Sequence, residues 1–228
     1  MERFVCVRVV QGWGMDLSLF QFDYRSTWAA FFMNADRSIY GRYSARDPKD
    51  LEGFAKALEG ALELHSGYPG NKAELAGKTG PPAPWKTAEE IPQLRRKGKF
   101  READAHKGCI HCHNVEDGWT KSLRDAGQPV PDRLMARWPR PERMGVTLAP
   151  GERAAVIEVQ KGTPADKAGF RPGDRLVRLG GQPLLSVADV EWALYVAPDS
   201  GDLKARVDRA GETRELTVTL PPGWRFIE

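Results

Sequence analysis

The sequence predicts a mixed fold, with an α/β domain over residues 1–65 and an α+β domain over 141–222. A strand, hairpin and helix pattern occupies the first region, whereas the last one carries short strands and two helices. Between them lie a proline- and glycine-rich linker, 66–98, and a cysteine-containing segment, 99–140. The chain has 228 residues, 41% hydrophobic and 29% charged, enough apolar material for two small cores rather than one large one.

Charge and hydropathy exclude some classes of partner and location. The net charge is +3, from 34 basic residues interspersed with 31 acidic ones, which argues against nucleic acid or an anionic membrane as the main partner. No apolar run approaches the roughly 18 residues that a transmembrane helix needs, and no hydrophobic signal region follows Met1. We expect a cytoplasmic protein if the chain is complete as written, and a periplasmic or cell-envelope protein if its true start lies upstream.

Several secondary-structure elements are predicted in the first domain. Residues 4–10 are β-branched and apolar, which predicts a buried strand with Cys6 as a core cysteine. Residues 28–33 predict a second strand, 34–37 a hairpin turn and 38–43 the returning strand. A helix is expected from Pro48 to Leu64. Its apolar face at helical spacing consists of Leu51, Phe54, Ala55, Leu58, Ala61 and Leu62.

The middle of the chain has a different composition. Residues 66–98 are rich in proline and glycine and predict an extended linker or wrapping segment, with Trp85 and Ile91 docking on a neighbouring element. A modest helical region is expected over 99–124, interrupted near Gly108 and Gly118.

This helical region carries the motif Cys109-Ile110-His111-Cys112-His113. Two thiols three residues apart, followed at once by an imidazole, have the spacing that attaches haem c. Cys109 and Cys112 would form the thioethers and His113 would ligate the haem iron. A distal ligand is expected from among Met135, Met144, His106 and His111.

Other chemistries fit the same residues. Cys109 and Cys112 are also candidate redox thiols, because His111 beside them would lower a thiol pKa. Zinc or copper could be held by the two cysteines with two of His106, His111 and His113. The motif could also hold no cofactor, as a structural disulfide or free thiols.

The last domain contains the segments Met144–Leu148 and Ala155–Val159 and the long motif TPADKAGFRPGDRLVRLGGQPL at residues 163–184. These residues, above all the long motif, resemble a bacterial PDZ domain of the kind found beside HtrA proteases. This resemblance implies a groove helix over residues 187–196 and a closing hairpin formed by residues 203–207 and 215–220.

The PDZ resemblance also implies a site. PDZ domains add an extended peptide to a sheet edge and hold its terminal carboxylate on a loop, here residues 143–146, where Gly145 would permit close approach. The expected partners are peptide or protein C-termini, although an internal docking role remains open. A serine protease is disfavoured because no Gly-x-Ser-x-Gly-like site precedes the domain. The predicted peptide-binding residues are Met144, Gly145, Val146, Thr147, Leu148, Val190 and Leu194.

Residues 34–43 and the following helix resemble the second half of a thioredoxin-like domain, which makes residues 1–65 a partial one. The order of a thioredoxin-like segment, the cysteine motif and a PDZ domain resembles that of bacterial thioredoxin and PDZ domain-containing proteins or selenoproteins, of the type common in planctomycetes. This implies an exported thiol or selenol oxidoreductase or electron carrier with a redox partner, whose catalytic group lies in the half-domain missing before Phe4. The alternative is a non-enzymatic PDZ scaffold with a structural metal site or redox dithiol at the cysteine motif.

Overall fold

The computed structural model describes residues 3–9, 12–44, 51–96, 112–136, 138–149 and 151–226. They belong to two compact units, each built from two separate stretches of chain. Unit 1 comprises Met1–Arg25 and Pro81–Val130, and unit 2 comprises Ser26–Gly80 and Pro131–Glu228. Within the described ranges, no helix is long and apolar enough to cross a membrane.

Unit 1 contains the helices η2 (Ala88–Glu90), α2 (Pro92–Arg96) and α3 (Cys112–Asp125). The predicted interruption at Gly118 is wrong, because α3 runs through this residue without a break. A Cβ atom at Gly118 would lie 2.9 Å from Leu94 Cγ, so the glycine lets α2 and α3 pack closely. The core of the unit consists of Leu17, Tyr24, Ala88, Ile91, Leu94 and Val115, with Trp85 packed against it.

The start of the chain does not form the predicted buried strand. Residues 4–9 have no regular secondary structure, and Cys6 is exposed rather than part of a core. Val5 and Val7 are 93% and 82% exposed. β-branched residues favour a strand only where a neighbouring strand and a packing surface are available, and no strand among the described residues pairs with this segment.

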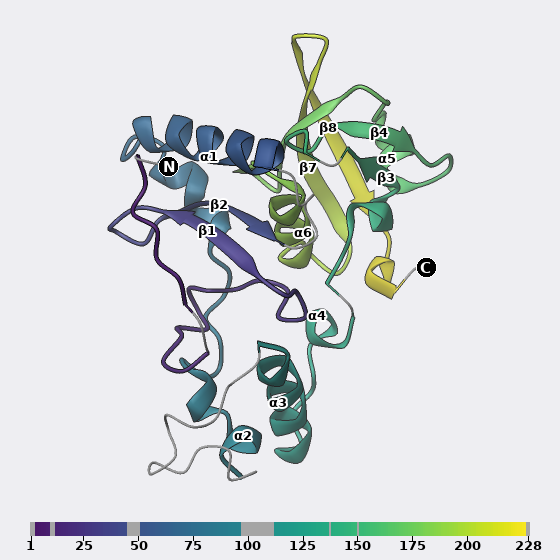
Figure 1. Cartoon of the computed structure of the whole chain (residues 1–228). Helices are drawn as coiled ribbons and strands as arrows, with labels where there is room; N and C mark the ends of the chain where they lie inside the picture. Colours follow the sequence, from purple (N-terminus) through teal and green to yellow (C-terminus); the bar gives the residue numbers. More distant parts are fainter. Residues whose placement is uncertain are drawn as a thin grey trace. The chain divides into compact units, whose positions relative to one another are not determined.

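Unit 2 begins with the predicted hairpin and helix, whose elements are drawn in blue and purple in Figure 1. Strands β1 (Ala29–Met33) and β2 (Ile39–Ser44) pair antiparallel, and the Asn34 side chain accepts a hydrogen bond from Ser38 N across the turn. Helix α1 (Leu51–Ser66) packs on the hairpin. Its buried positions are the small residues Gly53, Ala57, Gly60 and Ala61.

The predicted apolar face of α1 is wrong at Leu51 and Ala55, which are both exposed. The extended conformation expected over residues 66–98 is also wrong in large part. Helix η1 (Lys72–Lys78) packs on β2 and buries Leu75 and Lys78, and η2 and α2 supply buried residues to unit 1. The predicted docking of Trp85 and Ile91 is confirmed, because Ile91 lies in the core of unit 1 and Trp85 packs against it. Local composition indicated a linker because it does not report the surfaces on which the segment packs. We call β1, β2, α1 and η1 the hairpin module.

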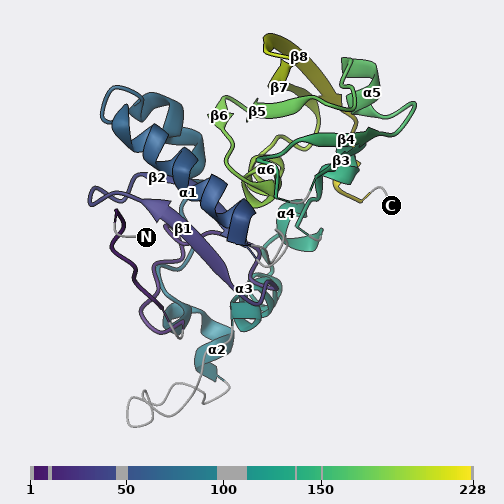
Figure 2. The same cartoon turned by 45° about the horizontal axis from the view of Figure 1, so that its top comes forward.

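The rest of unit 2 surrounds the largest core, and Figure 2 shows α6 inside this part, below β5 and β6. Strand β3 pairs with β4, and a second sheet has the order β6-β5-β7-β8. The predicted closing hairpin is confirmed, because β7 and β8 pair antiparallel from Gly201 opposite Leu220 to Arg209 opposite Glu212. The elements are α4 (Asp132–Met135), η4 (Pro141–Met144), β3 (Val146–Leu148), β4 (Val156–Val159), α5 (Pro164–Ala168), β5 (Arg175–Leu179), β6 (Gln182–Pro183), α6 (Val187–Tyr195), β7 (Gly201–Arg209), β8 (Glu212–Leu220) and η5 (Trp224–Phe226).

Candidate functional site

Strand β3 offers an open edge. It pairs with β4 on one side, with Val146 opposite Val159 and Thr147 opposite Glu158, and no further described strand joins this sheet. The loop before β3 turns at Gly145, which has a φ of 98°. Gly145 N donates to Glu142 O at 3.0 Å, and its carbonyl oxygen accepts from Gln160 N at 2.9 Å. A strand-like ligand could therefore add to β3 and end at this turn.

The predicted peptide-binding side chains come together in one cluster. Met144, Val146, Val190 and Leu194 are all fully buried and belong to the same hydrophobic core, as does Leu148. Thr147, between two buried positions on β3, is partly exposed. The side chains predicted to line the pocket for the ligand are thus mostly buried in the core of unit 2.

Close packing against Thr163 requires glycine at position 145, which the sequence did not reveal. An ideal Cβ atom at this position would lie 2.0 Å from Thr163 Oγ1 and 2.3 Å from Thr163 Cβ. Thr163 is held in place because Oγ1 donates to Gln160 O at 2.6 Å and caps α5 by accepting from Asp166 N. Any side chain at position 145 therefore collides with an anchored residue.

Helix α6 is fixed at its first turn by a polar network with the hairpin module. Ser186 caps the helix by accepting from Asp189 N, and its hydroxyl donates to Arg42 O at 2.5 Å. The Asp189 carboxylate accepts from Arg42 N and from Leu185 N, both at 3.0 Å. A serine followed three residues later by an acidic residue indicates a helix N-terminus. This pattern does not indicate that Ser186 and Asp189 also bind β2, a strand far from them in the sequence.

A buried ion pair completes this network. Lys78 Nζ lies 2.9 Å from Asp189 Oδ2, and both side chains are completely buried. Burial lowers the pKa of Lys78 to about 8, although the attraction of Asp189 opposes this shift. Apart from its ion pair with Asp189, Lys78 Nζ makes no hydrogen bond to any residue that the structure describes. The Arg42 guanidinium stacks 3.9 Å from the Trp192 ring centre, and Trp192 Nε1 donates to Gly77 O.

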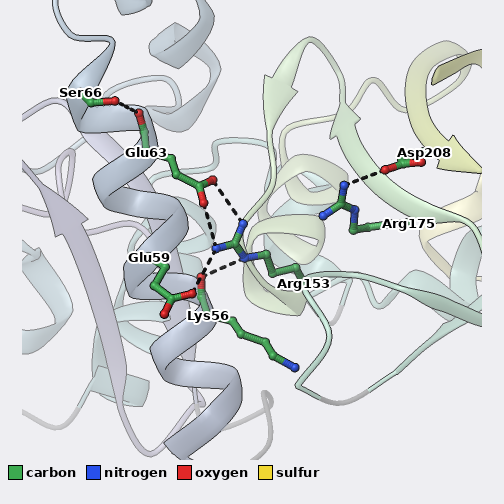
Figure 3. Close-up of polar contacts among 7 residues, drawn as sticks. All are labelled: Lys56, Glu59, Glu63, Ser66, Arg153, Arg175 and Asp208. Carbon is green, nitrogen blue, oxygen red and sulfur yellow. Dashed lines mark hydrogen bonds and ion pairs between the residues drawn. The ribbon is translucent and has the colours of Figure 1, made fainter. Parts of the chain in front are cut away.

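A second contact joins α1 to the loop between β3 and β4. Figure 3 shows Arg153 pointing to α1, where its Nε donates to Lys56 O at 2.9 Å and its Nη1 lies 3.3 Å from Glu63 Oε2. A Cβ atom at Gly60 would lie 2.7 Å from Leu185 Cδ2 and 3.4 Å from Arg153 Cζ. Helix α1 therefore contacts both the loop after β3, through Arg153, and the segment before α6, through Leu185.

The cysteine motif is only partly described by the structure. Cys109, His111 and His106 lie outside the described residues. Cys112 begins α3 and is half-buried against the core of unit 1, and His113 is exposed. Burial raises the pKa of Cys112, the opposite of what a reactive thiolate requires.

The predicted distal and metal ligands are also placed only in part. Met144, one of the candidates for distal haem ligand, lies inside the core of unit 2, which makes its sulfur unavailable. Met135 is 53% exposed. Within the described ranges, no three histidine, cysteine or acidic side chains cluster as a metal site would require.

Comparison with known proteins identifies the type of domain that contains β3 and α6. A family model described as PDZ domain matches residues 142–220. The serine protease Do-like HtrB of Bacillus subtilis is 39% identical over 71 residues, 31% of this chain and 16% of that protein. The putative serine protease HhoB of Synechocystis is 29% identical over 140 residues, 61% of this chain and 29% of that protein.

Solved structures give weak overall similarity. The HtrA3 PDZ domain bound to a phage-derived ligand has 20% sequence identity and a TM-score of 0.30, covering 34% of this chain and 83% of that one. A serine endoprotease from Yersinia pestis has 20% identity and a TM-score of 0.34, covering 49% and 36%. The chain spans less than a third of the length of the curated relatives it matches. Residues 142–220 form a PDZ domain of the type that HtrA-like proteases carry.

Proposed function

We propose that the PDZ domain binds the C-terminal segment of a partner protein, which adds as a strand to the open edge of β3. The observation that carries this proposal is the edge of β3 with which no strand of the described part of the chain pairs, next to the turn at Gly145. The terminal carboxylate would lie against the backbone of residues 143–146. Because Val146, Val190 and Leu194 are apolar, an apolar side chain is expected at the ligand's last residue.

Fluorescence polarisation with a library of labelled C-terminal peptides tests this proposal. The matched control is the best peptide with its carboxylate converted to an amide, which keeps every side chain and removes only the terminal charge. We expect the amide to bind at least about tenfold more weakly, because charge-assisted hydrogen bonds to backbone N–H groups are lost. Equal binding of acid and amide would show that this loop does not recognise a C-terminus.

The same groove also fits a non-enzymatic scaffold, in which the PDZ domain recruits partners or docks internally and nothing else acts. The HtrA-like relatives are named as proteases, but this chain spans only 16% of HtrB and 29% of HhoB. Peptide hydrolysis by this chain is not part of the proposal. Mass spectrometry of the bound peptide after long incubation distinguishes a scaffold from a protease, because only the protease shortens the peptide.

We also propose that the cysteine motif has a redox or cofactor role, with haem c on Cys109 and Cys112 and His113 as its ligand. The motif spacing supports this, as does the position of Cys112 and His113 together on the first turn of α3. The hairpin of β1 and β2 followed by helix α1 is compatible with the second half of a thioredoxin-like domain, and an envelope location and a redox partner would follow. When bound, haem would supply one-electron transfer.

Protein expressed in a host that matures cytochromes should then show a Soret band and a haem-staining band on a denaturing gel. Cys112→Ser should remove one thioether, and His113→Ala should leave the haem attached but change its spectrum. A colourless product would refute haem. Zinc or copper in elemental analysis would then support a metal site, and two free thiols without metal would support a dithiol.

A further inference from the structure

We propose that Asp189, Lys78 and Arg42 are positioning residues of the peptide groove, through which the hairpin module fixes α6 at its working distance from β3. This inference rests on the proposed peptide binding and adds to it. Under this proposal, the hairpin module and the PDZ domain together determine the geometry of the peptide-binding groove.

Helix α6 has two faces with different partners. Val190 and Leu194 are one turn apart and lie in the core that also contains the β3 residues. Asp189, the residue before Val190, instead binds β2 and η1. A shift of the helix at Asp189 therefore moves Val190 relative to β3, because the helix backbone is rigid over one turn.

The contact between Asp189 and the hairpin module leaves little freedom. A Cβ atom at Gly41 would lie 2.7 Å from Leu185 Cδ1 and 2.8 Å from Asp189 Oδ2, so β2 approaches the start of α6 as closely as a backbone can. The carboxylate is also bonded to two backbone N–H groups. Close packing on one side and directional hydrogen bonds on the other define a single position for the first turn of α6.

Stability and positioning respond differently to the charge on Lys78. The charged groups acting on Lys78 are Asp189 of α6, which attracts it, and Arg42 of β2, which repels it. Burial makes the ammonium costly for the folded protein, so its loss above about pH 8 favours folding. The same loss removes the cation that holds Asp189. Raising the pH should therefore increase the stability of unit 2 and weaken peptide binding, two effects of opposite sign.

Peptide affinity of the full chain, measured by fluorescence polarisation with the best C-terminal peptide, tests the proposal. Lys78→Met removes the charge at every pH and keeps an unbranched side chain of similar length. We expect about fivefold weaker binding than wild type near pH 7, together with a lower melting temperature, because methionine leaves the buried carboxylate of Asp189 without its cation or a replacement donor. Wild-type affinity should fall about threefold between about pH 7 and pH 9.5, whereas that of Lys78→Met should stay constant.

Two further variants keep the experiment decisive. Arg206→Met breaks the exposed Arg206–Glu215 pair on the β7–β8 hairpin and should leave affinity unchanged. Asp189→Asn removes the other charge of the pair with little change in size, and should weaken binding even if Lys78→Met fails to fold. If wild type, Lys78→Met and Asp189→Asn bind equally at every pH, the positioning role is refuted while peptide binding stands. A wild type that binds no C-terminal peptide overturns the proposed function and this inference with it.

Discussion

Replacing Gly145 with alanine should destabilise unit 2 by about 3 kcal/mol, from two separate causes. The φ of 98° is unfavourable for any residue with a Cβ atom and costs about 1 to 2 kcal/mol. The new methyl group would also lie 2.0 Å from Thr163 Oγ1. Moving Thr163 aside sacrifices the cap of α5, which is worth about 1 kcal/mol. A Gly145 variant that loses peptide binding must therefore be checked for folding first.

Gly181→Ala is the matched control for this prediction. Gly181 also has a positive φ, 82°, but a Cβ atom there would meet nothing within 4 Å. Urea unfolding followed by tryptophan fluorescence should show a loss of about 1 kcal/mol for Gly181→Ala and about three times as much for Gly145→Ala. Equal losses in the two variants would refute the role assigned to Thr163.

Three further predictions concern the hairpin module. Leu185→Ala should cost about 3 kcal/mol in urea unfolding, because Leu185 is 6% exposed and packs in the core of the module; a cost below about 1 kcal/mol would contradict that packing. Because the pKa of Lys78 is about 8 folded and 10.5 as a free side chain, the unfolded chain binds more protons between these values. The free energy of unfolding should therefore rise across this pH interval, by up to about 3 kcal/mol. The same rise in Lys78→Met would show that Lys78 is not its source. Arg153→Ala should cost less than about 1 kcal/mol by thermal melting, because Glu59 and Glu63 are exposed, and a larger loss would mean that this contact anchors α1.

The sequence predicted the parts of unit 2 whose signals are local. The β1–β2 hairpin was found from an apolar run and an alternating segment on either side of a turn, and the PDZ domain from its long motif at residues 163–184. The groove helix, predicted over residues 187–196, is observed over Val187–Tyr195. Each of these segments carries the pattern of its own structure, and neighbouring contacts reinforce it.

The parts that were missed depend on contacts between distant segments. Lys78 belongs to a segment whose composition indicated a linker, and Asp189 belongs to a helix end where an acidic residue is ordinary. Neither position suggests a buried ion pair, because charged residues are usually exposed. Residues 4–9, the described part of the strand predicted over 4–10, show the converse error, since their β-branched, apolar composition predicted a strand without supplying a partner for it.

The hairpin module and the peptide groove are coupled because the same residues contact the module and hold α6. Leu185 lies directly before the cap of α6 and belongs to the core formed by β2 and α1. The position of α6 thus depends on contacts that the PDZ fold itself does not provide. Because linkage between two equilibria is reciprocal, a peptide that selects one position of α6 must also stabilise the contacts of Asp189 with Lys78 and Arg42. Under the proposed function, the hairpin module therefore responds to ligand binding as well as supporting it.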